Sequence, residues 1–514
     1  MRKELTVGIV VLIHACTVGA LAQSERGQLG RSAPPQIDFS KVQELIEKKM
    51  ADQSVPSFAI AVAKDGKIIW EQGFGWADRE HHIPATAHTP YLVASITKPI
   101  TATAVMILAE RGKIDLDHPV NDYLGAAKLR GLAANAKQAT VWRVLSQSSG
   151  LPTHYQYFFT DEPERPPKLG ETIRRYGNIV FPPGERFVYS NLGYGILGRV
   201  IERVSAQSYS DFLQTEVFLP LGMHESSVWV RPDLAGQTAI PYGQNGEVIP
   251  SYVFDTPGSG AVYSSVHDLT LFAMLQLGTL MPEQRRILSE RSVNEMQRPL
   301  IDTDVPPLKY GMGWFVNEDL FGYRCIFHGG GAPGAETIIR LIPSEHIVAV
   351  AVSNANGGLP AVAVHEILSV LLPQYAARRK VARDPPATRA LPFEPGRSLV
   401  GEWRGRVYTY ERNLPITLFF KRDGEVQVRL DTQATTQLND VAFLNDHLTG
   451  HMSGDIRTGD ADRAGRASYQ LTLDLDLRGK ALKGAIMTEP TEESVKRTGS
   501  GLSHWTELSK VREQ

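Results

Sequence analysis

The chain contains little cysteine, since only Cys16 and Cys325 occur among its 514 residues. If Cys16 is lost with a leader segment, no intramolecular disulfide can form, and stability must come from burial of a hydrophobic core. Cys325 and His328 lie three residues apart on a predicted strand, which points them to opposite faces and disfavours a Cys–His nucleophile pair. We interpret Cys325 as a buried structural thiol.

Long runs of one charge sign are also missing. Lys and Arg total 54 against 56 Asp and Glu, which leaves a net charge of −2. A chain without a basic arm or patch has no electrostatic footprint for nucleic acid, so we expect no nucleic-acid partner. Its length exceeds the roughly 250–300 residues at which single cores stop growing, so we expect at least two domains.

The first residues have the pattern of an export signal. Residues 2–3 are positively charged, residues 5–12 are apolar, and residues 20–22 form a small-x-small cleavage site. We therefore predict a signal peptide over 1–22 and a periplasmic or secreted protein.

A membrane anchor is the alternative use of this segment. His14 interrupts the apolar stretch, which falls short of the ~20 residues that a spanning helix needs. We expect no integral membrane span after cleavage. Cys16 is a weak match to a lipoprotein acylation site, and its lipidation stays open.

Two common hydrolase signatures are absent. The sequence His328-Gly-Gly-Gly331 would suit the oxyanion hole of an α/β-hydrolase, but no Gly-x-Ser-x-Gly elbow follows it. His81-His82 lacks metal-ligand spacing, and His365-Glu366 lacks the second histidine of His-Glu-x-x-His. We expect neither a catalytic metal nor a cofactor.

Residues 36–376 have the pattern of an α+β domain. Strands at both ends of this region, with helices between them, predict one sheet that unites its N- and C-terminal parts. The predicted helices are 39–50, 95–111, 192–204 and 362–372, and the predicted strands are 58–63, 68–70, 324–328, 337–342 and 347–353.

The composition changes after residue 376. Residues 377–397 are rich in proline and predict a semi-rigid linker. In 398–511, Tyr469 to Leu477 alternates at period two, and Asp423-Gly424 supplies a hairpin turn, so we predict an antiparallel β-barrel or sandwich. Gly401-Glu-Trp403 resembles the opening of lipocalin-like barrels. Such a domain could mediate self-association, gate the cleft or bind a ligand.

Ser95 and Lys98 carry the chemical argument. Pro99 is tolerated only in a first helical turn, so the helix should begin at about Ser95. Residues three apart share a helix face, which would place the Lys98 nitrogen beside the Ser95 hydroxyl. That lysine can accept the hydroxyl proton only if burial or a neighbouring charge lowers its pKa by several units from ~10.4.

Two further motifs lie where this chemistry needs them. Tyr189-Ser-Asn191 precedes a predicted helix, and His328-Gly-Gly330 follows a predicted strand, where absent side chains would expose backbone N–H groups. With Ser95-Ile-Thr-Lys98, they resemble the three motifs of the serine β-lactamase, D-Ala-D-Ala carboxypeptidase and class C esterase family. The resemblance covers most of 38–375. Supporting segments are 112–120, 146–152, 260–269 and 310–314.

The resemblance implies a role for each motif residue. Ser95 would be the nucleophile, Lys98 and Tyr189 the coupled proton-handling pair, and Asn191 a hydrogen-bonding group for substrate or lysine. The residues of the third motif, His328, Gly329, Gly330 and Gly331, would contact the substrate. The oxyanion donors would be the backbone N–H groups of Ser95 and Gly331.

The third motif departs from that of penicillin-directed relatives because His328 replaces a lysine. This favours an esterase, amidase or peptidase acting on a small molecule or peptide over a β-lactamase or D-Ala-D-Ala carboxypeptidase. His328 is either an imidazolium that holds an anionic substrate below pH ~6.5 or a neutral group that donates one hydrogen bond. An alternative of another class is a non-catalytic penicillin- or peptide-binding protein, which three intact motifs disfavour.

Overall fold

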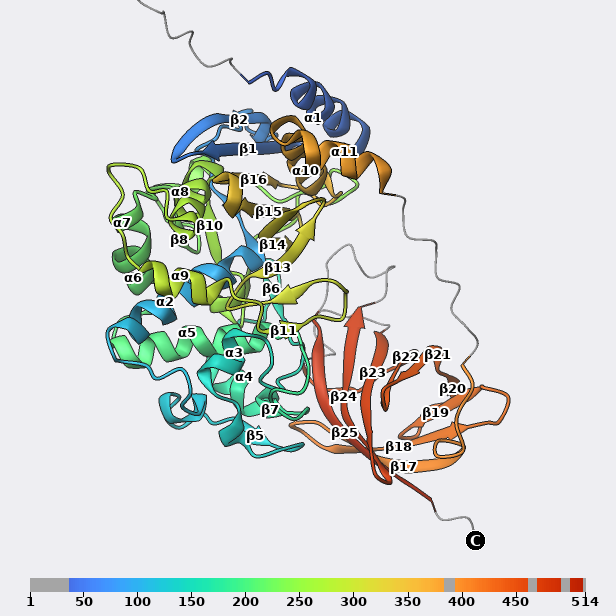
Figure 1. Ribbon diagram of the computed structural model, residues 1–514. Helices are drawn as coiled ribbons and strands as arrows, with labels where there is room; N and C mark the ends of the chain where they lie inside the picture. Colours follow the sequence, from blue (N-terminus) through green and yellow to red (C-terminus); the bar gives the residue numbers. More distant parts are fainter. Residues whose placement is uncertain (1–36, 383–392, 461–468, 491–499, 512–514) are drawn as a thin grey trace, which may run out of the picture. The chain divides into compact units, whose positions relative to one another are not determined.

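The computed structural model in Figure 1 describes residues 37–382, 393–460, 469–490 and 500–511. The predicted signal peptide over 1–22 and the middle of the predicted linker lie outside these residues. Within the described parts of the chain, no helix combines the length and the apolar character needed to cross a bilayer.

The N-terminal part is built on a nine-stranded sheet in the order β11-β12-β13-β14-β15-β16-β1-β2-β3. Both ends of the region contribute to it, because β1 pairs with β16 in antiparallel register. This confirms the predicted α+β fold. Its strands are β1 (Ser57–Lys64), β2 (Lys67–Asp78), β3 (Ile83–Pro84), β11 (Ile301–Asp302), β12 (Lys309–Tyr310), β13 (Phe315–Leu320), β14 (Tyr323–Ala332), β15 (Ala335–Ile342) and β16 (Ile347–Ser353).

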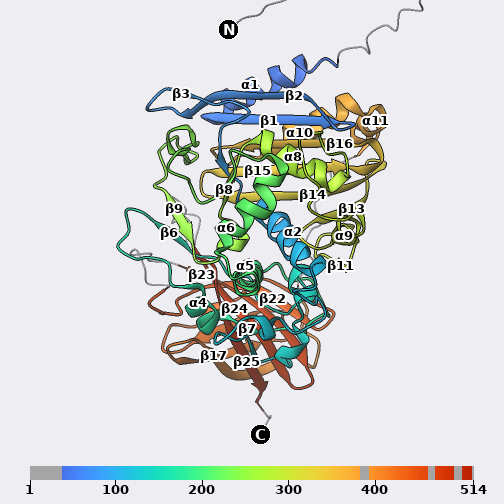
Figure 2. The same cartoon turned by 90° about the vertical axis from the view of Figure 1, so that its left-hand side faces the viewer.

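The central strand β1 is buried on both faces. Phe58 and Ile60 pack into one hydrophobic cluster, whereas Ala59 and Ala61 belong to another. Helices α1 (Ser40–Gln53) and α10 (Leu359–Leu371) cover the first face, with α11 (Pro373–Val381) beside α10, and α8 (Val266–Leu277) covers the second. Figure 1 shows α8 on one side of β16 and α10 and α11 on the other, and Figure 2 views the sheet from the α8 side. The near-continuous apolar run of this strand follows from its two covered faces.

The remaining helices lie on the α8 side of the sheet, where α2 packs against α5. They are α2 (Thr97–Glu110), α3 (Val141–Leu145), α4 (Leu169–Tyr176), α5 (Asn191–Ser205), α6 (Tyr209–Leu213), α7 (Leu219–Leu221) and α9 (Glu290–Met296). This region also contains three small sheets. The first consists of β4 (Tyr91–Leu92), β10 (Val262–Ser264) and β8 (Ser227–Val228). The second pairs β5 (Arg130–Gly131) with β7 (Asn178–Ile179), and the third pairs β6 (Tyr157–Phe159) with β9 (Tyr252–Phe254).

The C-terminal part is a second nine-stranded antiparallel sheet in the order β20-β19-β18-β17-β25-β24-β23-β22-β21. Its two outermost strands are separated in sequence by Leu438 alone, so the sheet must curl until its ends come together, as in a barrel. Its strands are β17 (Gly401–Tyr408), β18 (Asn413–Phe420), β19 (Val426–Leu430), β20 (Thr436–Gln437), β21 (Asn439–Leu444), β22 (His447–Gly454), β23 (Tyr469–Arg478), β24 (Ala481–Pro490) and β25 (Leu502–Lys510).

Trp403 lies inside this barrel-like sheet. Its side chain is buried, and its indole N–H donates to the carbonyl of Leu399 at 2.7 Å. Packing inside a barrel is enough to account for a buried Trp, so Trp403 gives no evidence of a bound ligand. The lipocalin-like character of the tail therefore stays a prediction.

The predicted linker over 377–397 needs a correction at its start. Residues 377–381 complete α11, which ends at Val381, because alanine and basic residues there favour a last helical turn. The proposed boundary therefore moves to after Ala382.

We expect limited proteolysis of the native protein to cut first between Ala382 and Arg397, because proline-rich connections lack the ladder bonds that protect strands. The fragments would be resolved by intact mass. A first cut inside 401–511 would contradict a separately folded C-terminal domain.

Candidate active site

Ser95 lies in a tight turn at the start of α2. Residues Ala94–Ile96 form a 3₁₀ turn that runs directly into the helix, so the helix proper begins two residues later than predicted. Ala94 has φ of +46°, which is uncommon for a residue with a side chain. Val93 fixes the turn, since its N–H donates to the carbonyl of Val262 at 3.0 Å. Strained backbone of this kind clusters at functional sites.

Lys98 is fully buried and reaches three oxygen atoms. Its Nζ lies 3.0 Å from Ser95 Oγ, 2.7 Å from Asn191 Oδ1 and 3.0 Å from the carbonyl oxygen of Ser259. Burial lowers the pKa of Lys98 well below its usual range. The predicted neighbourhood of serine and lysine is therefore present, and burial favours the neutral form of the amine.

The three hydrogen bonds of Lys98 use all the donors of an ammonium, because Nζ donates to Ser95 Oγ, Asn191 Oδ1 and the Ser259 carbonyl oxygen. A neutral amine has two N–H donors and one lone pair, and the oxygens of Asn191 and Ser259 can only accept. In the neutral form, the two donors can stay on those oxygens while the lone pair takes the proton of the Ser95 hydroxyl.

Tyr189 and Asn191 flank the start of α5. Ser190 caps this helix, because its Oγ accepts from the N–H of Gly193 at 3.1 Å, which places Asn191 in the first turn. Tyr189 precedes the cap, with Lys98 Nζ 4.7 Å from its ring centroid. Burial raises the pKa of Tyr189, although a hydrogen bond with Ser95 opposes the rise, so the phenol is protonated.

The third motif lies on β14 and passes beside the Ser95 turn. A Cβ at Gly330 would collide with the carbonyl oxygen of Val93 and come within 3.3 Å of the Ser95 nitrogen. Only glycine permits this approach. Gly329 and Gly331 line a pocket of about 400 Å³ that Thr337 and Asn356 also border. The three predicted motifs therefore meet at one location, where Gly330 contacts the Ser95 turn and His328 lies beside Tyr189.

His328 is buried and neutral. Burial, together with the positive charge that Lys98 can carry, lowers the pKa of His328 to about 3. Its Nδ1 lies 2.7 Å from the carbonyl of Gly329, and its Nε2 lies 3.3 Å from the hydroxyl of Tyr310. Of the two interpretations of His328, the structure favours the neutral hydrogen-bonding group.

Accordingly, we expect KM for an anionic ester and KM for a neutral ester to show the same pH dependence between pH 5.5 and 8. The imidazole carries no charge to lose in this window, because its pKa of about 3 lies below it. Steady-state kinetics with two esters that differ only in a remote carboxylate would test this. A KM that rises through pH 6.5 for the anionic ester alone would contradict it.

Sequence reasoning missed several residues of the site. The Ser259 carbonyl oxygen is a partner of Lys98, and the rings of Phe187, Tyr310 and Phe315 pack around Tyr189 and His328. Ser259 precedes the segment 260–269 and Tyr310 opens the segment 310–314, both of which resemble the family. The sequence resemblance identified these two segments, but it did not predict the contacts of Ser259 with Lys98 and of Tyr310 with His328.

The family model described as Beta-lactamase matches residues 42–372, which is more than half of the chain. The chain belongs to the β-lactamase family. This match covers the N-terminal nine-stranded sheet, helices α2 to α10 and every residue of the candidate site, whereas α11 and the C-terminal barrel-like sheet lie outside it.

Two proteins of similar sequence match the chain over part of its length. The chain is 27% identical over 325 residues to Protein flp of Staphylococcus aureus (strain N315), covering 62% of this chain and 63% of that protein. It is 27% identical over 301 residues to penicillin-binding protein 4* of Bacillus subtilis (strain 168), covering 54% and 64%. The chain thus spans less than two thirds of the length of either relative.

A solved structure extends the likeness of the fold to the C-terminal sheet. The octameric penicillin-binding protein homologue from Pyrococcus abyssi matches with a TM-score of 0.56 and 23% identity, covering 92% of this chain and all of that one. At this identity the likeness supports the fold alone. The β-lactamase fold followed by a barrel-like sheet therefore also occurs in a solved protein.

Proposed function

We propose that the protein is a serine hydrolase that forms an acyl-enzyme on Ser95 and acts on esters, amides or peptides. One observation carries this proposal: the fully buried Lys98 has its Nζ 3.0 Å from Ser95 Oγ, and burial lowers the pKa of this lysine well below its usual range. A serine nucleophile is weak until a neighbouring base can accept its proton, and a lysine whose pKa is lowered is suited to accept it.

In the acylation step, Ser95 Oγ attacks the substrate carbonyl carbon while its proton passes to Lys98 Nζ. The carbonyl π-electrons move to the oxygen and form a tetrahedral oxyanion. Collapse of this intermediate breaks the bond to the leaving group, which takes a proton from Tyr189. The phenolate then recovers a proton from the Lys98 ammonium, so the pair returns to its starting state.

Hydrolysis of the acyl-enzyme repeats these steps with water as the nucleophile. The same pair accepts the water proton, and Ser95 Oγ leaves with a proton restored. The oxyanion would be held by the N–H groups of Ser95 and Gly331. The close packing of Gly330 against the Ser95 turn brings the two segments into range of one substrate oxygen.

The substrate class follows from the charge of the site. A carboxylate needs a cation or several donors to replace its hydration, and neutral His328 supplies no cation. The rings of Phe187, Tyr189, Tyr310 and Phe315 instead give the site an aromatic wall, which suits an uncharged acyl group. We therefore place esters, amides and peptides before β-lactams.

A β-lactamase or D-Ala-D-Ala carboxypeptidase activity is the second candidate. Two similar proteins have penicillin-binding names, and the family model is that of β-lactamases. A non-catalytic penicillin- or peptide-binding protein is the candidate of another class.

One experiment separates the three candidates. The protein would be mixed with a p-nitrophenyl ester, with a penicillin and with a fluorophosphonate, and its intact mass and product release would be followed. We expect the fluorophosphonate to add one adduct at Ser95 and the ester to turn over. Penicillin turnover without ester turnover would favour the second candidate, and failure to label Ser95 with any reagent would overturn the proposal.

Export and self-association complete the proposed function. The charged start and apolar run of residues 1–22 support export to the periplasm or medium. Association through the C-terminal sheet is supported by the octameric state named for the Pyrococcus abyssi homologue.

A further inference from the structure

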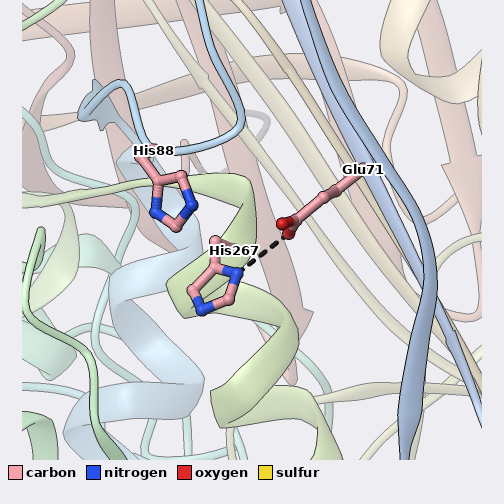
Figure 3. Close-up of side chains that lie close together, drawn as sticks. All are labelled: Glu71, His88 and His267. Atoms are coloured by element: carbon pink, nitrogen blue, oxygen red, sulfur yellow. Dashed lines mark hydrogen bonds and ion pairs between the residues drawn. The ribbon is translucent and has the colours of Figure 1, made fainter.

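Three side chains that can ligate metals meet outside the serine site. Glu71 comes from β2, His88 from the loop before β4, and His267 from the first turn of α8. One ligand atom of each lies within 4.8 Å of the others. Figure 3 shows the three side chains close together. His267 Nδ1 is 2.9 Å from Glu71 Oε2, and the two imidazole rings have centroids 4.5 Å apart.

The backbone beneath these side chains is held in place. The N–H of Thr86 donates to Thr89 Oγ1 at 2.9 Å, and the N–H of His88 donates to Thr86 Oγ1 at 3.1 Å. His267 is tied to the same loop, because its N–H donates to the carbonyl of Ala87 at 3.2 Å. Ligands on fixed backbone lose less entropy when they bind an ion.

Negative charge surrounds the two imidazoles. Glu225 Oε1 lies 3.6 Å from His88 Nδ1, and the buried carboxyl of Asp268 adjoins Glu225. Asp268 is held in place, because its Oδ2 accepts from the N–H of Glu225 at 2.8 Å. The carboxylates of Glu71 and Glu225 therefore each lie beside one of the two imidazoles.

We propose that Glu71, His88 and His267 bind a divalent transition-metal ion of the zinc class, with Glu225 as a fourth ligand or charge-balancing group. Mixed imidazole and carboxylate ligands suit Zn²⁺ and its neighbours, whereas Mg²⁺ and Ca²⁺ prefer oxygen alone. Zinc bonds of about 2.0–2.2 Å put ligand atoms roughly 3.4 Å apart, so the widest separations in the cluster must shrink by up to about 1.4 Å. His88 can supply this movement, because its side chain is 52% exposed.

The ion would be structural. It would connect β2 and the loop before β4 to α8, three segments that approach each other here without a covalent link. Because a metal that binds only the folded state stabilises it, zinc should also raise the thermal midpoint. This site is separate from the serine chemistry, which needs no metal.

The test is calorimetric titration of Zn²⁺ into the untagged, chelator-treated protein. We expect one ion per chain and a rise of the unfolding midpoint by a few degrees. His88→Ala and His267→Gln should each weaken zinc binding at least tenfold, the second variant keeping a polar group beside Glu71. His118→Ala is the matched control, since His118 is an exposed histidine 3.4 Å from a single carboxylate, Asp115.

Two outcomes would overturn the site. The first is an absence of zinc binding to the wild-type protein at micromolar concentrations. The second is unchanged binding by the double variant His88→Ala/His267→Gln when circular dichroism shows it folded, because the ion would then lie elsewhere. Neither outcome bears on ester turnover, so the serine hydrolase proposal is tested independently.

Discussion

Replacing Ser95 by alanine is expected to lower kcat for ester hydrolysis by a factor that approaches the ~10⁶ lost when other serine hydrolases lose their nucleophile. The loss is large because no other hydroxyl can form the covalent intermediate at this position. Lys98 keeps its two acceptors on Asn191 and Ser259 in the variant, so the fold should persist. The measurement is ester turnover beside a thermal melt.

Ser369→Ala is the matched control for this variant. Ser369 also lies on a helix, α10, and its hydroxyl donates to the carbonyl of His365 at 2.9 Å. Its replacement should leave the rate within twofold of wild type. Turnover by purified Ser95→Ala close to that of Ser369→Ala would refute the assignment of the nucleophile.

Lys98→Met should reduce kcat/KM by ~10²–10⁴, the range that general acid–base groups contribute. Methionine has similar length and is tolerated in a buried position, but it has no lone pair able to take the serine proton. Lys98→Arg should fail equally, because a guanidinium stays charged. An active Lys98→Arg enzyme would show that the side chain acts by its charge and not as a base.

Asn191→Asp tests the same lysine without removing it. A carboxylate in place of the amide oxygen, 2.7 Å from Nζ, would favour the ammonium and raise the pKa of Lys98. Since the base must be neutral, the acidic limb of the kcat/KM profile should move to higher pH. An unmoved limb would mean that another group controls it.

Local patterns in the sequence were sufficient to predict much of the fold. The apolar segments 58–63 and 68–70 predicted β1 and β2, and the residues from Leu192 predicted α5. Period-two alternation predicted β23. Helix α11 was not predicted, because the last predicted helix ended at residue 372 and the proline-rich linker was extended back to residue 377.

Local patterns in the sequence likewise predicted some features of the candidate site and missed others. Spacing of three residues predicted the contact between Ser95 and Lys98, since a helical turn fixes it. The neutral state of His328 depends on the packing of distant segments, which no local pattern encodes. The cluster of Glu71, His88 and His267 combines residues almost 200 positions apart, so no metal-ligand spacing exists to find.

The three glycines of the third motif differ in how much room the structure leaves them. A side chain at Gly330 has no space, whereas one at Gly331 meets nothing within 4 Å and one at Gly329 meets only ordinary contacts from 3.8 Å. Both open positions border the pocket of about 400 Å³, which Pro360 and Ala361 of α10 also line. Ser95, Lys98, Tyr189 and Asn191 are not among the residues that line this pocket. Side chains added at positions 329 and 331 would therefore enter a space beside the candidate site, while the backbone N–H group of residue 331 stays in place for the oxyanion.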